Sequence, residues 1–162
     1  MTPQLDRPPF PEHASTVSGR IYSVGYEGFD TNAFVRRLAD AEISCLVDVR
    51  LNAASRKPGF SRKSLAAKLG EAGINYVHER DLGNPPDNRD SFRSGDGVEG
   101  RRRMREIIED QAGPALHRVA DLARRERIAV LCVERDRHRC HRDVVTEMVQ
   151  ELDPGIEVLH IL

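Results

Sequence analysis

Short apolar runs alternate with segments of helical periodicity along most of the chain, and this alternation restricts the fold more than any other feature. Runs that are apolar throughout are typical of parallel strands covered on both faces. Strands joined by helical crossovers form mainly parallel sheets, so the sequence predicts a three-layer α/β (Rossmann-like) fold with about five strands and helices on both faces. The expected strands cover residues 21–24, 43–49, 74–78, 128–133 and 156–161. The expected helices include residues 61–72, 101–111 and 139–152, and others beginning near Thr31 and Pro114.

Length and charge fit one globular domain. At 162 residues the chain is long enough to bury a core. Residues 1–19 are rich in proline and poor in apolar side chains, so we expect a flexible N-terminal tail, with residues 20–162 forming a single α/β domain. The net charge of −1 excludes a protein that binds nucleic acid over its whole surface. Any such binding needs a local basic patch.

Cysteine content and hydropathy bear on the cellular compartment. The three cysteines form an odd set without the spacing of a disulfide scaffold, which favours a reducing compartment. No apolar run approaches the length of a membrane span. The N-terminus lacks the charged and then apolar plan of a signal peptide. The sequence therefore predicts a cytoplasmic protein with no membrane association.

Asp48 and Arg50 lie at the end of the predicted strand 43–49, with their side chains on the same face. A buried carboxylate is costly unless it is paired or hydrogen-bonded. One interpretation is that Asp48 pairs with Arg50 or accepts hydrogen bonds from loop N–H groups. Another is that Asp48 holds Arg50 toward an anion. The two interpretations are compatible.

Two turns contribute further candidates. Residues 25–28 (GYEG) join the first strand to a helix, and their glycines are expected for steric reasons, while a ligand role stays open for Tyr26 and Glu27. The loop 51–60 is basic, with Arg56 and Lys57 beside a Pro-Gly turn. Both turns are expected near the carboxyl edge of the sheet, where ligands bind in α/β folds.

Residues 79–100 are rich in Gly, Pro, Asn and Asp, and they are expected to lack regular structure. Loops of this length are typically lids or binding loops, so the segment is expected to form a lid, with partial disorder as the alternative. The helix expected next, 101–111, begins with an arginine cluster at residues 101–105. Cations are disfavoured at a helix N-terminus, so this placement indicates anchoring by the acidic loop before it, anion binding, or a solvated charged face.

The richest stretch is residues 128–145 (IAVLCVERDRHRCHRDVV), an apolar strand followed by a polar turn and a helix. Cys132 and Glu134 share one face of the strand end. Cys140, His141 and Arg142 are expected to be the first residues of the helix, whose N-terminus presents free N–H groups at the sheet edge. The stretch thus predicts a site, without naming its reaction.

Several motifs together resemble one known family. The segments IYSVGYEG, LVDVRLNAASRKPGFS, GINYVHERDLGNP and LCVERDRHRCHR look like the family called domain of unknown function 488, and the resemblance covers residues 21–161. This implies an α/β fold and a shared site, but no activity. Positions matching the family pattern are Gly25, Asp48, Arg50, Ser55, Gly83, Cys132, Glu134, Cys140, His141 and Arg142. Many members have His at the place of Tyr26 and Pro at that of Ala53 or Ala54.

Three kinds of chemistry fit these residues. Cys140, between cationic side chains near a helix N-terminus, has the setting of a reactive thiolate, although buried cysteines are often inert. Cys132, Cys140 and His141, with Glu134 or His138, contain enough ligands for zinc, but their spacing lacks a CxxC signature, so no cofactor is predicted and zinc stays an alternative. Arg50 and Arg142 could instead form an anion site in which Glu134 orients an arginine or acts as a general base. A structural network of ion pairs between Glu134 and arginine is the rival to this favoured interpretation.

The favoured function is therefore a small cytosolic enzyme that acts on a phosphate-containing substrate, a nucleotide or nucleic acid, at the carboxyl edge of the sheet. Its catalytic candidates are Glu134, Cys140 and His141. Its substrate-binding candidates are Arg50, Arg142, Tyr26, Ser55 and Arg56. One alternative is a non-catalytic nucleotide or nucleic-acid binding module that uses Arg50, Arg56, Lys57 and the arginine cluster at residues 101–105. The other is a metal or redox thiol site at Cys132, Cys140 and His141.

Overall fold

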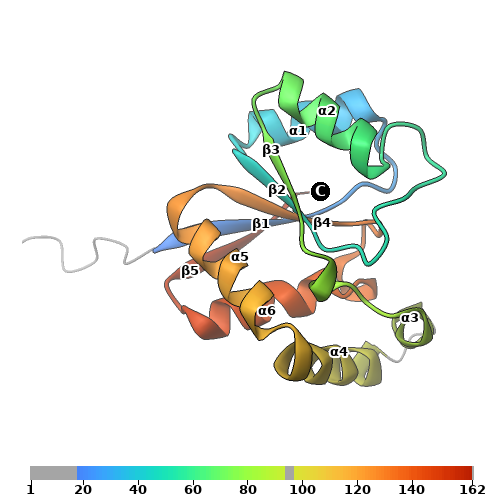
Figure 1. Ribbon diagram of the computed structural model, residues 1–162, viewed down its shortest axis with the longest axis vertical. Coiled ribbons are helices and arrows are strands. Elements are labelled where there is room, and N and C mark those ends of the chain that lie inside the picture. Colours follow the sequence, from blue (N-terminus) through green and yellow to red (C-terminus); the bar gives the residue numbers. More distant parts are fainter. Residues whose placement is uncertain (1–17, 94–96, 162) are drawn as a thin grey trace, which may run out of the picture.

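The structure, a computed structural model, describes residues 18–93 and 97–161 (Figure 1). Five parallel strands form one sheet in the order β3-β2-β4-β1-β5. The strands are β1 (Gly19–Gly25), β2 (Cys45–Asp48), β3 (Asn75–His78), β4 (Ile128–Cys132) and β5 (Ile156–Ile161). The predicted mainly parallel sheet is confirmed. The expected N-terminal tail lies outside the described residues except for Ser18 and Gly19, and Gly19 already belongs to β1.

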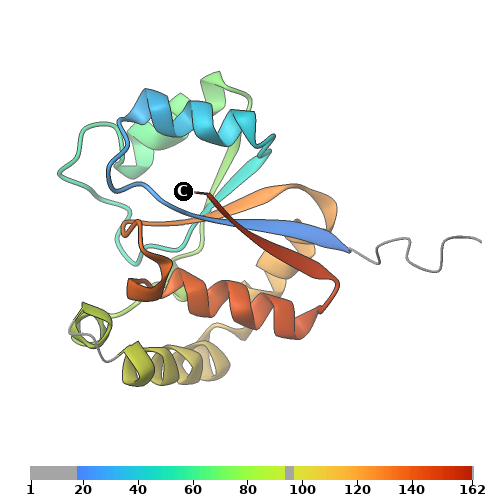
Figure 2. The same ribbon diagram turned by 180° about the vertical axis from the view of Figure 1, so that it is seen from behind.

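Helices cover both faces of the sheet, as predicted. On one face lie α1 (Thr31–Asp40) and α2 (Arg62–Glu71). On the other lie α5 (Gly113–Arg125) and α6 (Arg142–Leu152), and α4 (Gly97–Gln111) packs beyond them (Figure 2). None of the helices in residues 18–93 and 97–161 is long and apolar enough to cross a membrane.

The sheet separates two apolar cores because successive side chains of a strand point to opposite faces. In β2, Leu46 packs on the α1 and α2 side, whereas Cys45 and Val47 pack on the α5 and α6 side. Val49, just after β2, joins the second core. Cys132 at the end of β4 follows Val130 on the same face, so its thiol points to the layer that contains α6.

The segment 79–100 is largely helical, and the expectation of an irregular loop is wrong. It contains a 3-10 helix (Arg80–Leu82) and α3 (Pro86–Arg93), and α4 already begins at Gly97. Phe92 is buried against Gly100, and the Asn88 side chain donates to the carbonyl oxygen of Gly100 at 3.0 Å. The only buried side chains of α3 are one aromatic ring and one amide. The sequence of the segment therefore lacks the apolar periodicity by which helices are predicted.

The arginine cluster lies in the second turn of α4 because this helix begins four residues earlier than predicted. Each of its guanidiniums contacts a carboxylate. The pairs are Arg101 with Asp143 and Glu147, Arg102 with Glu99 and Glu106, Arg103 with Asp87, and Arg105 with Glu147 and Glu151. The cluster is thus neutralised within the chain, and Asp87 supplies the expected anchoring by the acidic segment before it.

Helix α6 begins at Arg142, so Cys140 and His141 precede it instead of forming its first turn. A 3-10 helix (Arg137–Arg139) occupies the turn after β4. Asp136 caps this short helix by accepting a hydrogen bond from the main-chain N–H of His138 at 3.0 Å. The extra turn places Cys140 and His141 between β4 and α6, directly at the carboxyl edge of the sheet.

Candidate functional site

A pocket of about 580 Å³ opens at the carboxyl edge of the sheet. It is lined by the loop after β2, by α3 and by the segment between β4 and α6. Cys132, Cys140 and His141 line its interior and are almost completely buried. Glu134 lies beside them, half-buried. The structure thus brings together in one cavity all three predicted catalytic candidates.

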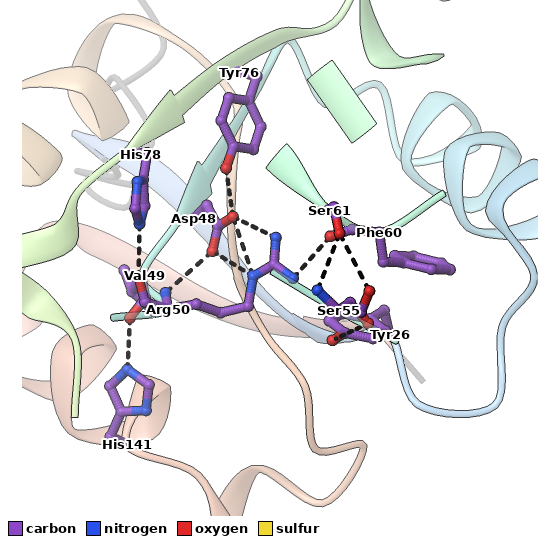
Figure 3. A network of polar contacts seen from close by, with 10 residues as sticks. All are labelled: Tyr26, Asp48, Val49, Arg50, Ser55, Phe60, Ser61, Tyr76, His78 and His141. Atoms are coloured by element: carbon purple, nitrogen blue, oxygen red, sulfur yellow. Dashed lines mark hydrogen bonds and ion pairs between the residues drawn. The ribbon is translucent and has the colours of Figure 1, made fainter. Parts of the chain in front are cut away.

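The orientation of His141 is fixed by the main chain at the end of β2. Its Nε2 lies 2.8 Å from the carbonyl oxygen of Val49 (Figure 3). A carbonyl oxygen can only accept, so Nε2 must carry a hydrogen. In the neutral imidazole, Nδ1 then has a free lone pair. Nδ1 lies 3.7 Å from Sγ of Cys132 and 3.8 Å from Sγ of Cys140, between the two thiols.

The two thiols have opposite pKa shifts. The hydrogen bond to Cys140, together with burial, raises the pKa of Cys132. Burial opposes ionisation of Cys140, but the hydrogen bond from Cys132 and the positive charge of His141 outweigh it and lower the pKa of Cys140. The negative charge of Cys140 raises the pKa of His141 against the effect of burial. Cys140 is therefore the thiol that ionises first.

Glu134 is the acidic member of the site. Its Oε2 lies 3.6 Å from Sγ of Cys132. Burial raises the pKa of Glu134, and the negative charge of Cys140 adds to this rise. A carboxyl group beside a cavity, with its pKa raised by burial, is suited to act as a general acid or base.

The turn after β1 positions the Glu134 segment. The N–H of Tyr26 donates to the carbonyl oxygen of Cys132 at 3.3 Å, and the N–H of Glu27 donates to that of Val133 at 2.9 Å. A Cβ atom at Gly25 would lie 1.9 Å from the carbonyl oxygen of Glu134. Glycine is thus required at position 25 by a close approach of two chain segments, in agreement with the steric interpretation of this turn.

Arg50 forms a buried ion pair with Asp48, and the predicted pairing is confirmed (Figure 3). Its Nη2 lies 2.7 Å from Oδ2 of Asp48, and its Nη1 donates to the carbonyl oxygen of Phe60 at 2.8 Å. Tyr76 donates a further hydrogen bond to Asp48. Arg50 borders the pocket, but its guanidinium holds the loop after β2 instead of pointing to a ligand, so the geometry gives its predicted anion-binding role no support.

Arg142 is buried away from the pocket, contrary to its predicted place in an anion site. Its Nε donates to the Ser23 hydroxyl at 2.8 Å, and its two terminal nitrogens donate to the carbonyl oxygens of Glu134 and Arg135. Arg142 therefore supports the main chain that carries Glu134. The rival interpretation is also incorrect in detail, because Arg142 contacts the carbonyl group of Glu134 and not its carboxylate.

Two other predicted substrate ligands also serve the scaffold. Tyr26 stacks on Phe60 with ring centroids 4.4 Å apart, and its hydroxyl donates to the Ser55 hydroxyl at 3.1 Å. Ser55 accepts a second hydrogen bond from the N–H of Lys57. Neither Tyr26 nor Ser55 lines the pocket, whereas Arg56 does.

Comparison with protein families matches residues 30–149 to the family described as "Domain of unknown function DUF488". The chain belongs to this family. The match includes every predicted catalytic residue and ends before β5. No curated protein and no solved structure matches the chain.

In this DUF488 domain, sequence reasoning missed three pocket arginines. Arg89 and Arg93 lie one turn apart on α3, and Arg139 precedes Cys140. None of the three forms an ion pair with the described carboxylates, and the same holds for Arg56. The spacing of four residues between Arg89 and Arg93 would have indicated a shared helix face, had a helix been expected there.

Proposed function

We propose that the pocket is the active site of a small enzyme that acts on a phosphate-containing substrate, a nucleotide or nucleic acid. The observation that carries this proposal is the composition of one cavity. Four arginines without a carboxylate partner among the described residues line the same cavity as two thiols, an imidazole and a half-buried carboxyl group. Such a cavity can bind an anion and place reacting groups against it.

The arginines support an anionic substrate. Guanidinium groups form paired hydrogen bonds that match phosphate and carboxylate oxygens. Arg56, Arg89, Arg93 and Arg139 come from three separate segments and line the same cavity. Glu134 is the single carboxylate in the lining of this cavity, against these four arginines. The field in the pocket is thus positive, although the chain as a whole has a net charge of −1.

The reacting groups are Glu134, Cys140 and His141. Glu134 is the general acid or base, because it is the half-buried carboxyl group beside the anion site. Cys140 and His141 lie in contact at 3.8 Å at the buried end of the pocket. Arg50 and Arg142 act indirectly by holding the loops that carry Arg56 and Glu134.

The alternative of an open nucleic-acid binding strip has less support. It relied on Arg50, Arg56, Lys57 and the arginine cluster of α4. Arg50 pairs with Asp48, and each arginine of the cluster contacts a carboxylate. The ammonium group of Lys57, another residue of the predicted strip, lies 5.5 Å from the centroid of the Phe60 ring.

The three cysteines are thiols in this structure, which supports placing the protein in the reducing cytoplasm.

Anion affinity and turnover test the proposal separately. We would titrate the protein with inorganic phosphate and with nucleoside monophosphates by calorimetry, and measure phosphate release from nucleotides and oligonucleotides. Replacing both Arg89 and Arg93 with Ala removes two charged contacts, and we expect affinity to fall by about tenfold or more. Glu134→Gln should retain affinity and lose turnover.

The control is Arg36→Ala, which removes an exposed arginine of α1 that does not line the pocket. It should leave anion affinity unchanged. Equal affinity in the wild type and the Arg89/Arg93 double variant would overturn the proposal that this pocket binds phosphate groups.

A further inference from the structure

We infer that Cys132, Cys140 and His141 bind a zinc ion at the buried end of the pocket. The inference deepens the proposed function: it rests on that function for the role of the metal in a reaction, but not for metal binding itself. Zinc is the ion that two thiolates and one imidazole favour among the common divalent metals of proteins.

The distances between the donor atoms support this assignment. Both Sγ atoms and Nδ1 of His141 lie within 4.8 Å of one another. A tetrahedral zinc ion, with bonds of about 2.3 Å to sulfur and about 2.0 Å to nitrogen, separates its sulfur and nitrogen ligands by about 3.5 Å. The observed separations of 3.7 and 3.8 Å are close to this value. The three side chains therefore surround a zinc-sized position with little rearrangement.

The hydrogen bonding of His141 supports the same conclusion. Its Nε2–H donates to the carbonyl oxygen of Val49. In the neutral imidazole, the form that binds metal, the lone pair of Nδ1 then points toward the two sulfur atoms. Histidine ligands of zinc commonly donate their second N–H to a main-chain carbonyl, which fixes the tautomer and the ring plane. The outer partner of a metal-binding histidine is thus already in place.

The fourth zinc position would face the pocket. All three ligands line it, and Glu134 lies beside them with its Oε2 3.6 Å from Sγ of Cys132. Structural zinc sites close with four protein ligands, whereas catalytic sites keep one position for water or substrate. With zinc bound, Cys140 and His141 would serve the reaction as ligands and not as nucleophile or base. Zinc would increase the acidity of a bound water molecule. Glu134, beside the ligands, would then be the group that takes the proton. The arrangement points to hydrolysis as the class of reaction in the proposed active site.

Metal analysis tests the inference directly. The full chain would be purified under reducing conditions without chelator, and its zinc content measured by mass spectrometry. We expect about one zinc ion per chain. Cys132→Ser and Cys140→Ser should each lose most of it. Cys45→Ser is the matched control, because Cys45 is equally buried but does not belong to the group, and this variant should keep its zinc.

Cobalt substitution provides a second measurement that does not depend on variants folding. The wild-type chain, stripped of metal and titrated with Co²⁺, should show sulfur-to-cobalt charge-transfer bands and the intense visible bands of four-coordinate Co²⁺. Absence of the sulfur bands would overturn the inference. So would zinc in fewer than about one chain in ten after incubation with Zn²⁺, or zinc retained equally by both serine variants.

The two proposals fail separately. Loss of phosphate affinity in the Arg89/Arg93 double variant, with a chain that binds no metal, would uphold the anion site and reject the zinc site. Stoichiometric zinc in a chain that binds no phosphate would do the reverse.

Discussion

The Nε2 atom of His141 lies 2.8 Å from the main-chain oxygen of Val49, although the two residues are 92 positions apart in the chain. The contact joins the end of β2 to the segment that precedes α6. It sets the tautomer of the imidazole and directs Nδ1 toward Cys132 and Cys140. The chemistry of the pocket therefore depends on the parallel pairing of β2 with β4, which brings these two segments to one edge.

Replacing His141 should weaken the fold as well as the site. His141→Ala leaves the buried carbonyl of Val49 without its donor, and we expect a loss of about 1–3 kcal/mol in the free energy of unfolding. Urea titration measures this change. His117→Ala, at an exposed position of α5, is the control and should have little effect. Equal unfolding midpoints for the two variants would contradict a structural role for the contact with Val49.

Neutralising Asp48 should be among the most damaging single changes. Asp48→Asn leaves the buried guanidinium of Arg50 without its charge partner, and the expected cost is about 3–5 kcal/mol. The exposed pair of Arg20 and Glu157 is the control, since Glu157→Gln should cost about 1 kcal/mol or less. Both are measured by chemical denaturation. A similarly small loss of unfolding free energy in the two variants would show that the fold does not need the buried pair.

Two glycine substitutions should have opposite effects on the free energy of unfolding. Gly25→Ala brings a Cβ atom against the carbonyl oxygen of Glu134, so the two segments must separate, and we expect a loss of about 2 kcal/mol or more. Gly70→Ala, inside α2 with open space around it, should stabilise the chain by about 0.5–1 kcal/mol. The midpoints of thermal unfolding of the two variants and the wild type measure these changes. Tolerance of alanine at position 25 would mean that the two segments do not approach closely.

The thiols should differ in accessibility to an alkylating reagent. Burial and the charge of Glu126 raise the pKa of Cys45 to about 11, so this residue should stay unmodified at pH 8 until the chain unfolds. Cys140 lines the pocket and has a lowered pKa, so it should be the first thiol to react once a chelator has removed any bound metal. Mass spectrometry of the digested protein counts the labels. Rapid labelling of Cys45 in the folded chain would show that this end of β2 is open.

The fold was predictable because each strand is a compact apolar run and the segments between strands have helical periodicity. Asp48 and Arg50 were also predictable as a pair, since they lie two residues apart on one strand face. Helix α3 was not, because Phe92 and Asn88 anchor it through contacts with the later residue Gly100, which local patterns do not show.

The grouping of the catalytic candidates was predictable, whereas Arg56 was the only one of the four unpaired pocket arginines that the sequence indicated. Cys132, Glu134, Cys140 and His141 come from one continuous stretch, and their meeting follows from a strand end and a turn. Whether an arginine binds a ligand or the protein depends on its tertiary partners. Arg142 donates to Ser23 and to two carbonyl groups, while Arg89 and Arg93 have no described carboxylate partner. Sequence alone does not distinguish these situations.

The most direct test of the central claim is the position of a bound phosphate analogue. Crystals of the full chain soaked in tungstate would locate the anion by its anomalous scattering. The proposed active site predicts a tungstate ion in the pocket, within reach of Arg89, Arg93 or Arg139 and facing Glu134 and Cys140. Tungstate bound at the α4 arginine cluster, with the pocket empty, would contradict the account.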